Sequence, residues 1–214
     1  MILDVHTHHP SPQPQGIIAL DIMNPGSGEL IADGEQLYSA GIHPWSTVRE
    51  IEDEEWRHLE KTAAAPNVVM IGETGIDTLR GGPLFRQMNI FRRHVELSER
   101  LGKPLILHIV KAHDQILGLR KELRAEMPWI VHGFRGKPGI ARRYVDAGFY
   151  LSFGDLYNED SLRQTPQDRI LAETDESPKD IEDIIARLSI TLNSPSLRNQ
   201  LVTNLSHILP SLST

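Results

Sequence analysis

The chain has 214 residues, of which 39% are hydrophobic and 24% charged, and it contains no cysteine. This composition excludes a disordered or fibrous chain, and the lack of cysteine excludes disulfides and thiolate metal sites. The formal net charge of −7 argues against a broad basic surface for duplex DNA. We expect one cytoplasmic domain over residues 1–214 without membrane contact, because no apolar run approaches the roughly 20 residues that span a bilayer.

Short apolar runs bounded by turn residues indicate eight strands, and helical patterns follow the later ones. The expected strands are Ile2–His8, Gly16–Ile22, Gln36–His43, Asn67–Glu73, Pro104–His108, Trp129–His132, Gly148–Phe153 and Arg169–Asp175. The expected helices are Asp53–Ala65, Leu84–Leu101, Ala112–Glu126, Ile140–Ala147 and Asp180–Leu188, with a last helix beginning near Ser194 or Ser196. Strands that alternate with helices indicate a parallel sheet, and eight of them predict an α/β fold, a (β/α)8 barrel of the TIM type.

The first third of the chain departs from this pattern. The segments "HPSPQPQG" and "NPGSGELIADGEQ" follow the first two expected strands and are rich in Pro and Gly. They are too short and broken for crossover helices, and Asp33-Gly34 fits the turn of an antiparallel hairpin. We therefore predict a trimmed barrel that lacks helices after its first two strands.

Five of the expected strands end in residues that are candidate metal ligands. These residues are His6, His8, Glu73, His108, His132 and Asp175. Taken singly, each has an ordinary explanation, such as a hydrogen-bonded core histidine, an N-cap or a turn residue. In a parallel barrel, however, all strand ends open on one face, where barrel enzymes keep their chemistry. We therefore expect the six side chains to share one pocket and one metal centre.

The number of ligands indicates more than one ion. Six ligands exceed the three protein ligands usual for one catalytic zinc, so we expect two divalent ions. We expect His6, His8 and Asp175 to hold the first ion, and the histidines of the fifth and sixth strands to hold the second, with Glu73 as a bridge. Histidine-rich sites favour zinc, manganese or iron; magnesium prefers oxygen ligands but is not excluded.

Short motifs along nearly the whole chain carry a family resemblance. They are "DVHTHH", "GIHPW", "GETGID", "KPLILH", "VHGFRG", "ILAETDESP" and the closing "NLSHIL". In this order they resemble the motifs of TatD-type metal-dependent hydrolases, often called TatD deoxyribonucleases, in the amidohydrolase superfamily. The resemblance implies one ion held by His6, His8, Glu73 and Asp175 and another held by Glu73, His108 and His132. It makes Asp175 the general base for a metal-bound water, with Glu73 as the second catalytic carboxylate.

Three positions depart from the family pattern. The histidine of the fifth strand is usually followed by Ser-Arg-x-Ala, but here "HIVKAH" follows, so Lys111 stands near a missing arginine and lacks the guanidinium fork. Thr78-Leu79 replaces an aromatic pair, and Trp45 stands where the family often has a second histidine. These changes favour a diverged branch of the family.

Candidate substrate-binding residues are His43, Lys111 and Arg135. Lys137 and Arg80 are two further cations that support phosphate binding. A turn-stabilising role is the alternative for His43. Ordinary solvated charge is the alternative for the four cations, and it is slightly favoured for Arg80.

The sequence predicts a two-metal hydrolase that attacks a phosphodiester with a metal-activated water. The expected partner is single-stranded DNA or a small phosphodiester, and the sequence indicates no protein partner. Two alternatives stay open: a metal-dependent amide or ester hydrolase of a small metabolite, and a non-catalytic metal-binding protein. The two carboxylates Glu73 and Asp175 argue against the latter, since a structural metal site needs no spare base.

Overall fold

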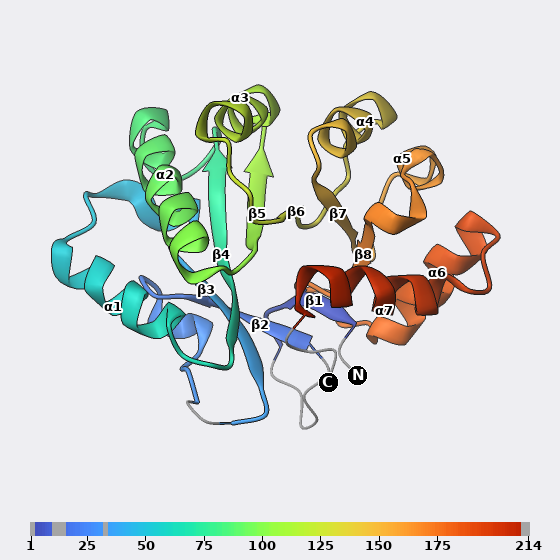
Figure 1. Cartoon of the computed structure of the whole chain (residues 1–214), viewed down its shortest axis with the longest axis horizontal. Helices are drawn as coiled ribbons and strands as arrows, with labels where there is room; N and C mark the ends of the chain where they lie inside the picture. Colours follow the sequence, from blue (N-terminus) through green and yellow to red (C-terminus); the bar gives the residue numbers. More distant parts are fainter. Residues whose placement is uncertain (1–2, 10–15, 32–33, 211–214) are drawn as a thin grey trace. The chain divides into compact units, whose positions relative to one another are not determined.

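The computed structural model describes residues 3–9, 16–31 and 34–210 (Figure 1). The eight strands follow one another in chain order, β1 to β8, in a closed barrel, and the paired strands run parallel. This order confirms the predicted (β/α)8 barrel. Contacts group the chain into two compact units, residues 1–17 with 130–214 and residues 18–129, which are described in turn. The expectation of a single domain stays a prediction.

The first unit contains the strands that begin and end the barrel order. Its elements are β1 (Asp4–Thr7), β6 (Trp129–Val131), α4 (Pro138–Asp146), β7 (Tyr150–Phe153), α5 (Glu159–Gln164), the 3-10 turn η3 (Gln167–Arg169), β8 (Ile170–Ala172), α6 (Ile181–Leu192) and α7 (Leu197–Ile208). Strand β8 lies between β1 and β7, and β7 also pairs with β6. Helix α7 packs against α6 and β8 (Figure 1).

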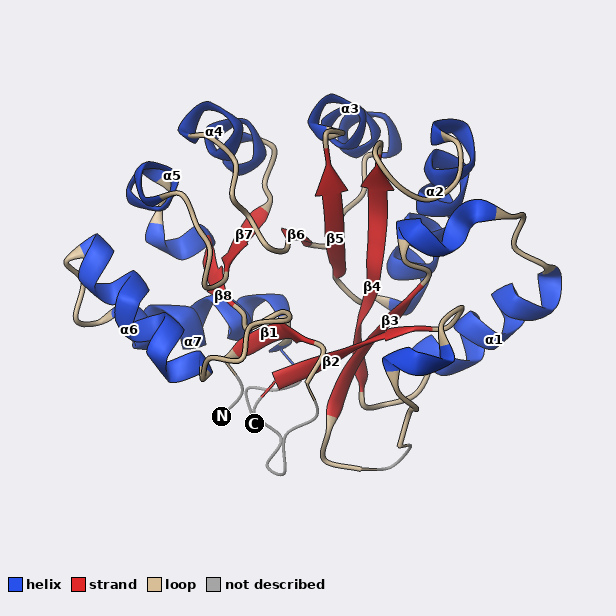
Figure 2. Cartoon of the chain, turned by 180° about the vertical axis from the view of Figure 1, so that it is seen from behind, coloured by secondary structure: helices blue, strands red, loops and turns tan. Residues whose placement is uncertain are grey.

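The second unit is built around a long strand. Its elements are β2 (Gly16–Asp21), the 3-10 turns η1 (Pro25–Ser27) and η2 (Pro44–Val48), β3 (Leu37–Gly41), α1 (Asp53–Ala63), β4 (Val68–Asp77), α2 (Leu84–Leu101), β5 (Leu105–Val110) and α3 (His113–Leu123). Strand β4 pairs with β3 on one side and β5 on the other, and β4 and β5 run side by side in Figure 2. Helix α2 packs against β4.

Local signals in the sequence fix several helix ends. Helix α2 has the predicted bounds and ends at Gly102, whose φ of 64° suits a residue without Cβ. Helix α6 begins after Asp180, whose side chain accepts a hydrogen bond from the Glu182 N–H at 2.8 Å. Helix α1 begins with a capping box between Glu52 and Glu55.

The early part of the chain is trimmed as predicted. Within the described residues, no α-helix lies between β1 and β3, and the only helical turn there is Pro25–Ser27. Asp33 of the expected hairpin turn lies outside the described residues. The structure adds α5, whose six residues are too few to show a helical period. No described helix is long and apolar enough to cross a membrane.

Candidate functional site

Strand β1 carries the predicted ligand His6, and the second predicted ligand, His8, follows one residue after the strand ends at Thr7. His6 is fully buried, whereas the His8 side chain is 33% exposed. The chain that leaves β8 runs alongside this strand: the Asp175 N–H donates to the His6 carbonyl at 2.9 Å, and the His8 N–H donates to the Asp175 carbonyl at 3.1 Å. The backbone of β1 therefore fixes Asp175 beside both histidines.

The side chains of these three residues present a set of metal donors. The Nε2 atoms of His6 and His8 lie 3.8 and 3.7 Å from Asp175 Oδ1, which is too long for a hydrogen bond. Two atoms bound to one zinc ion at about 2.0–2.2 Å in tetrahedral geometry lie roughly 3.3–3.6 Å apart. The observed distances are slightly longer than this range, and the donor types suit a divalent cation.

His132 lies next to this set and is held by a carboxylate that the sequence did not single out. Its ring centroid is 4.4 Å from that of His6, and its Nδ1 is 3.4 Å from Glu173 Oε1. Glu173 is fully buried and accepts a hydrogen bond from the Gly133 N–H at 2.6 Å. Burial raises the pKa of Glu173, but the hydrogen bond and charge of His132, the charge of His6 and a hydrogen bond from Ser152 together outweigh this effect and lower the pKa, so the group is a carboxylate at neutral pH. Glu173 thus orients the His132 ring.

Asp4 holds the segment that contains Asp175 through hydrogen bonds to Thr174. Its carboxylate accepts hydrogen bonds from the Thr174 N–H at 2.9 Å and the Thr174 hydroxyl at 2.6 Å. Burial raises the pKa of Asp4 to about 7, against the lowering effect of these hydrogen bonds. Thr174 directly precedes Asp175, so Asp4 anchors the segment that carries the predicted base.

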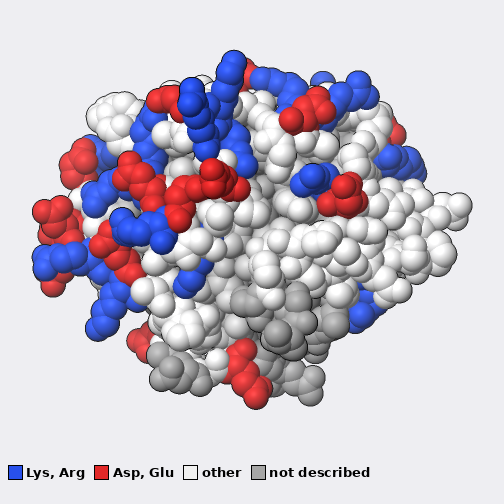
Figure 3. Space-filling model, in the orientation of Figure 1, with Lys and Arg blue, Asp and Glu red and all other residues white. Residues whose placement is uncertain are grey.

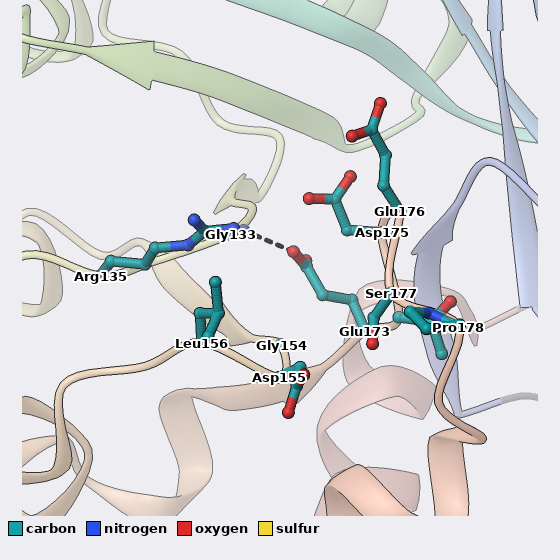
Figure 4. A pocket seen from close by; sticks show the side chains of 11 residues that line it. Gly133, Arg135, Gly154, Asp155, Leu156, Glu173, Asp175, Glu176, Ser177 and Pro178 are labelled. Atoms are coloured by element: carbon teal, nitrogen blue, oxygen red, sulfur yellow. Dashed lines mark hydrogen bonds between the residues drawn. The ribbon is translucent and has the colours of Figure 1, made fainter.

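A cavity of about 380 Å³ opens beside these groups in the first unit (Figure 4). It is lined by Gly133, Arg135, Gly154, Asp155, Leu156, Glu173, Thr174, Asp175, Glu176, Ser177 and Pro178. Arg135 is exposed, and Figure 4 shows its side chain and that of Asp175 on different sides of the cavity. A predicted substrate-binding cation and the predicted base therefore line one cavity.

The second unit places Glu73 in an irregular part of β4. The pairing with β5 shifts register between Ile71 and Thr74, and the Gly72–Glu73 peptide is cis. Gly75 has a φ of 147°, and a Cβ there would lie 2.0 Å from the His108 carbonyl oxygen. Strand β5 therefore approaches β4 closely only because residue 75 is glycine.

Glu73 lies close to two histidines of the second unit, His108 on the neighbouring strand β5 and His43 directly before η2. Its Oε1 lies 2.7 Å from His108 Nδ1 and 3.2 Å from His43 Nε2, and the two rings are linked by a 3.3 Å contact between the same nitrogens. On its other side, His108 Nε2 is 3.4 Å from Asp77 Oδ2. Burial raises the pKa of Asp77, but hydrogen bonds from Trp45 and the Leu79 N–H, together with the charge and hydrogen bond of His108, outweigh this effect and lower the pKa below its usual value, so Asp77 is charged at neutral pH.

The predicted residues thus gather in two groups, one in each unit. His6, His8, His132 and Asp175 come together in the first unit; Glu73 and His108 come together in the second, with His43 beside them. Lys111 is exposed just after β5, at a positive φ. The bridge by Glu73 between two ions stays a prediction.

The sequence reasoning passed over Asp4, Asp77 and Glu173 as functional residues. Each stands inside a quoted motif, as the first letter of "DVHTHH", the last of "GETGID" and the glutamate of "AETD". An acidic residue at a mostly apolar strand was the available signal, since an ionised carboxylate is rarely buried without a partner.

Comparisons with known proteins agree with the motifs. The family profile described as TatD related DNase matches residues 26–191. The chain belongs to this family. Over 157 residues it is 32% identical to the uncharacterized metal-dependent hydrolase YcfH of Escherichia coli K12, covering 69% of this chain and 58% of that protein. It is 31% identical to the uncharacterized metal-dependent hydrolase YabD of Bacillus subtilis, covering 69% and 61%. The matches span about three fifths of these TatD relatives.

Solved structures show the same fold. The crystal structure of YjjV, a TatD homologue from Escherichia coli K12, superposes with a TM-score of 0.80 over 98% of both chains, at 19% identity. A hydrolase of the TatD family from Entamoeba histolytica gives a TM-score of 0.73 over 84% of this chain and 76% of that one, at 18% identity. Both likenesses confirm the barrel predicted for this TatD family member.

Proposed function

We propose that this TatD family member is a metal-dependent phosphodiester hydrolase. The observation that carries the proposal is the donor set of His6, His8 and Asp175, in which both histidine Nε2 atoms lie 3.7–3.8 Å from Asp175 Oδ1, beside a cavity. The names of the relatives YcfH and YabD, both metal-dependent hydrolases, support the same class.

Two groups of residues would hold divalent ions. His6, His8 and Asp175 form the first group, in the first unit, and Glu73 with His108 forms the second group, in the second unit. Such ions lower the pKa of a bound water and stabilise charge on the attacking and leaving oxygens. Glu173 orients the ring of His132, and Asp77 orients the ring of His108.

Asp175 is the proposed general base. Its carboxylate takes a proton from the attacking water, the water oxygen forms a bond to phosphorus, and the bond from phosphorus to the leaving oxygen breaks; that oxygen keeps the electron pair and takes up a proton from solvent water. Asp175 suits this role because it is 24% exposed and lines the cavity, so a substrate reaches it. The backbone hydrogen bonds to His6 and His8 hold it in position.

The positive charge of Arg135 at the cavity favours a phosphodiester substrate over a neutral amide or ester. Arg135 lines the same cavity as Asp175, and a guanidinium binds two phosphate oxygens at once. On the face drawn in Figure 3, Lys and Arg lie among Asp and Glu rather than in one continuous basic surface. A short single strand or a small diester therefore suits the chain better than a long duplex.

Asp175→Asn tests the assignment. Asn tolerates the φ of 55° found at this position and keeps a carbonyl oxygen, so we expect the variant to retain much of its metal. An amide has no useful proton affinity near neutral pH, so kcat should fall by at least about 10²-fold. Metal content by elemental analysis and turnover are measured on one preparation.

The assay panel contains a single-stranded oligonucleotide, bis-nitrophenyl phosphate and nitrophenyl esters, each with and without chelator. Asp155→Asn is the matched control, because Asp155 lines the same cavity but pairs with Lys179 and Arg187. Chelator-sensitive cleavage of esters alone would assign the amide or ester class instead. Near-normal diester turnover by Asp175→Asn would rule out the base role.

A further inference from the structure

An exposed tryptophan and an arginine meet beside the group formed by Glu73 and His108. Trp45, in η2, is 43% exposed, and the Arg80 guanidinium carbon lies 4.4 Å from the centre of its ring. A guanidinium at this distance over an indole ring is attracted by the negative face of the ring. Arg80 is exposed, but this contact places its guanidinium over the ring, whereas the sequence slightly favoured an ordinary solvated charge.

Asp77 joins this pair to the predicted metal ligand. Its Oδ2 accepts a hydrogen bond from Trp45 Nε1 at 2.6 Å and faces His108 Nε2 at 3.4 Å. Its Oδ1 accepts from the Arg80 N–H at 3.1 Å. One buried carboxylate therefore fixes the tryptophan ring, the start of the arginine and the histidine ring in relation to one another.

The loop that carries Arg80 is held rigidly against η2. Buried Gln87 donates from its Nε2 to the carbonyls of Asp77, Arg80 and Gly82 at 2.8–3.0 Å. A Cβ at Gly81 would lie 2.1 Å from the Pro44 carbonyl oxygen, so the two loops approach this closely only because residue 81 is glycine. The position of Arg80 is thus built into the fold.

The charge of Arg80 has no carboxylate partner within the described part of the chain. Several other arginines of the second unit are paired with carboxylates: Arg86 pairs with Glu50 at 2.8 Å, and Arg92 pairs with Glu122 at 2.8 Å. A guanidinium that is held in place and not neutralised by a carboxylate, next to predicted metal ligands, is suited to an anion.

We infer that Arg80, held by Trp45, is a phosphate-binding subsite for the substrate. This inference rests on the proposed function and names a residue that determines substrate class. The guanidinium lies over the ring and keeps N–H donors for phosphate oxygens. A phosphate next to the one that is cleaved binds there, and the exposed part of Trp45 contacts the sugar or base attached to it.

Binding is measured directly, without turnover, on the metal-loaded protein. The probes are a deoxynucleoside bisphosphate and the matching deoxynucleoside without phosphate. Trp45 reports on the subsite by fluorescence, since the other two tryptophans, Trp56 and Trp129, are 4% and 0% exposed. Calorimetry gives the affinity independently of fluorescence. We expect the bisphosphate to bind and the free deoxynucleoside to bind much more weakly.

Arg80→Ala should weaken bisphosphate binding by about 10- to 100-fold, the range for a lost charge-assisted hydrogen bond. Arg80→Lys keeps the charge without the fork and should be intermediate. Arg93→Ala is the matched control, because Arg93 lies 3.7 Å over Trp56, a tryptophan that packs against His94 instead. On a diester substrate, Arg80→Ala should raise KM while kcat changes little, as expected for uniform binding.

The outcomes separate this inference from the proposed function. If bisphosphate binding falls in Arg80→Ala but not in Arg93→Ala, the subsite stands even when no diester is hydrolysed. If diesters are hydrolysed but Arg80→Ala binds the bisphosphate like the unmodified protein, the subsite is wrong and the proposed function stands. Equal affinity for the bisphosphate and the free deoxynucleoside also overturns the subsite.

Discussion

At the scale of single residues, the site depends on carboxylates that contact the predicted histidine ligands and orient their rings. Glu173 touches His132 and the Gly133 N–H, and Asp77 touches His108 and the Trp45 indole N–H. Such partners fix the tautomer and orientation of a ligand ring. The ring orientation of His132 is therefore set by Glu173, and that of His108 by Asp77.

Glu173→Gln tests this dependence. The amide keeps the size of the side chain but removes the charge that faces His132, and we expect metal affinity to fall by about 10- to 100-fold. Glu176→Gln is the control, since Glu176 is exposed and lines the same cavity. Metal titration by calorimetry on both variants measures the effect. Equal affinities in the two variants would show that Glu173 does not position a ligand.

At the scale of elements, the turn before η2 is fixed by a histidine on α2. His94 Nε2 accepts a hydrogen bond from the Ile42 N–H at 3.0 Å, and its Nδ1 donates to the Ile90 carbonyl at 2.8 Å. Burial lowers the pKa of His94 from 6.5 to about 4; the Ile90 hydrogen bond raises it and the charge of Arg93 lowers it. His94 is therefore neutral in the native protein at neutral pH.

This pKa predicts a pH-dependent stability. Between about pH 6.5 and 4 the unfolded chain binds a proton at His94 and the native protein does not, so the free energy of unfolding falls as the pH falls, by up to ~3 kcal/mol. His94→Gln should be less stable than the unmodified protein at neutral pH and should lose this part of the pH dependence. Urea unfolding at several pH values measures both proteins, with exposed His58→Gln as the control. Parallel pH curves for His94→Gln and the unmodified protein would contradict the prediction.

Local sequence signals predicted which segments form helices and strands, but they were less accurate about where the strands that carry the site residues end. The predicted bounds of helix α2 match the structure, because the spacing of its apolar residues and Gly102 define them locally. Strand β4 runs four residues past Glu73 to Asp77, because the register shift after Ile71 depends on the neighbouring strand. Strand β8 ends at Ala172, although the backbone near Asp175 still bonds to β1.

Contacts between segments that are distant in the chain could not be predicted from the sequence. The motifs named the ligands, since each strand end carries its own residue, but the contact of Arg80 with Trp45 joins two loops that the sequence separates. The support of Asp175 by Asp4 through Thr174 joins β1 to the end of β8. Tertiary packing, rather than local propensity, creates these pairs, so only a three-dimensional structure reveals them.

At the scale of the whole molecule, metal binding should be coupled to stability. Each unit brings together residues that are distant in the chain, such as His8 with Asp175 in one and His43 with Glu73 in the other. The unfolded chain does not hold these donors together, so an ion binds chiefly to the native state and stabilises it. Removing the ion also leaves acidic and imidazole groups, several of them buried, without the cation that they are suited to bind.

The size of the effect follows from mass action. A metal at 100 times its Kd adds about 2.7 kcal/mol of stability. In a chain of this length each kcal/mol shifts Tm by roughly 2–4 °C, so saturation should raise Tm by about 5–11 °C and chelation should reverse the rise. His8→Ala should show a smaller rise at the same metal concentration, whereas His9→Ala, an exposed neighbour outside the donor set, should keep it in full. Thermal unfolding with metal content verified on each sample decides the matter: equal Tm values for loaded and stripped protein would mean that the native fold holds no tightly bound ion.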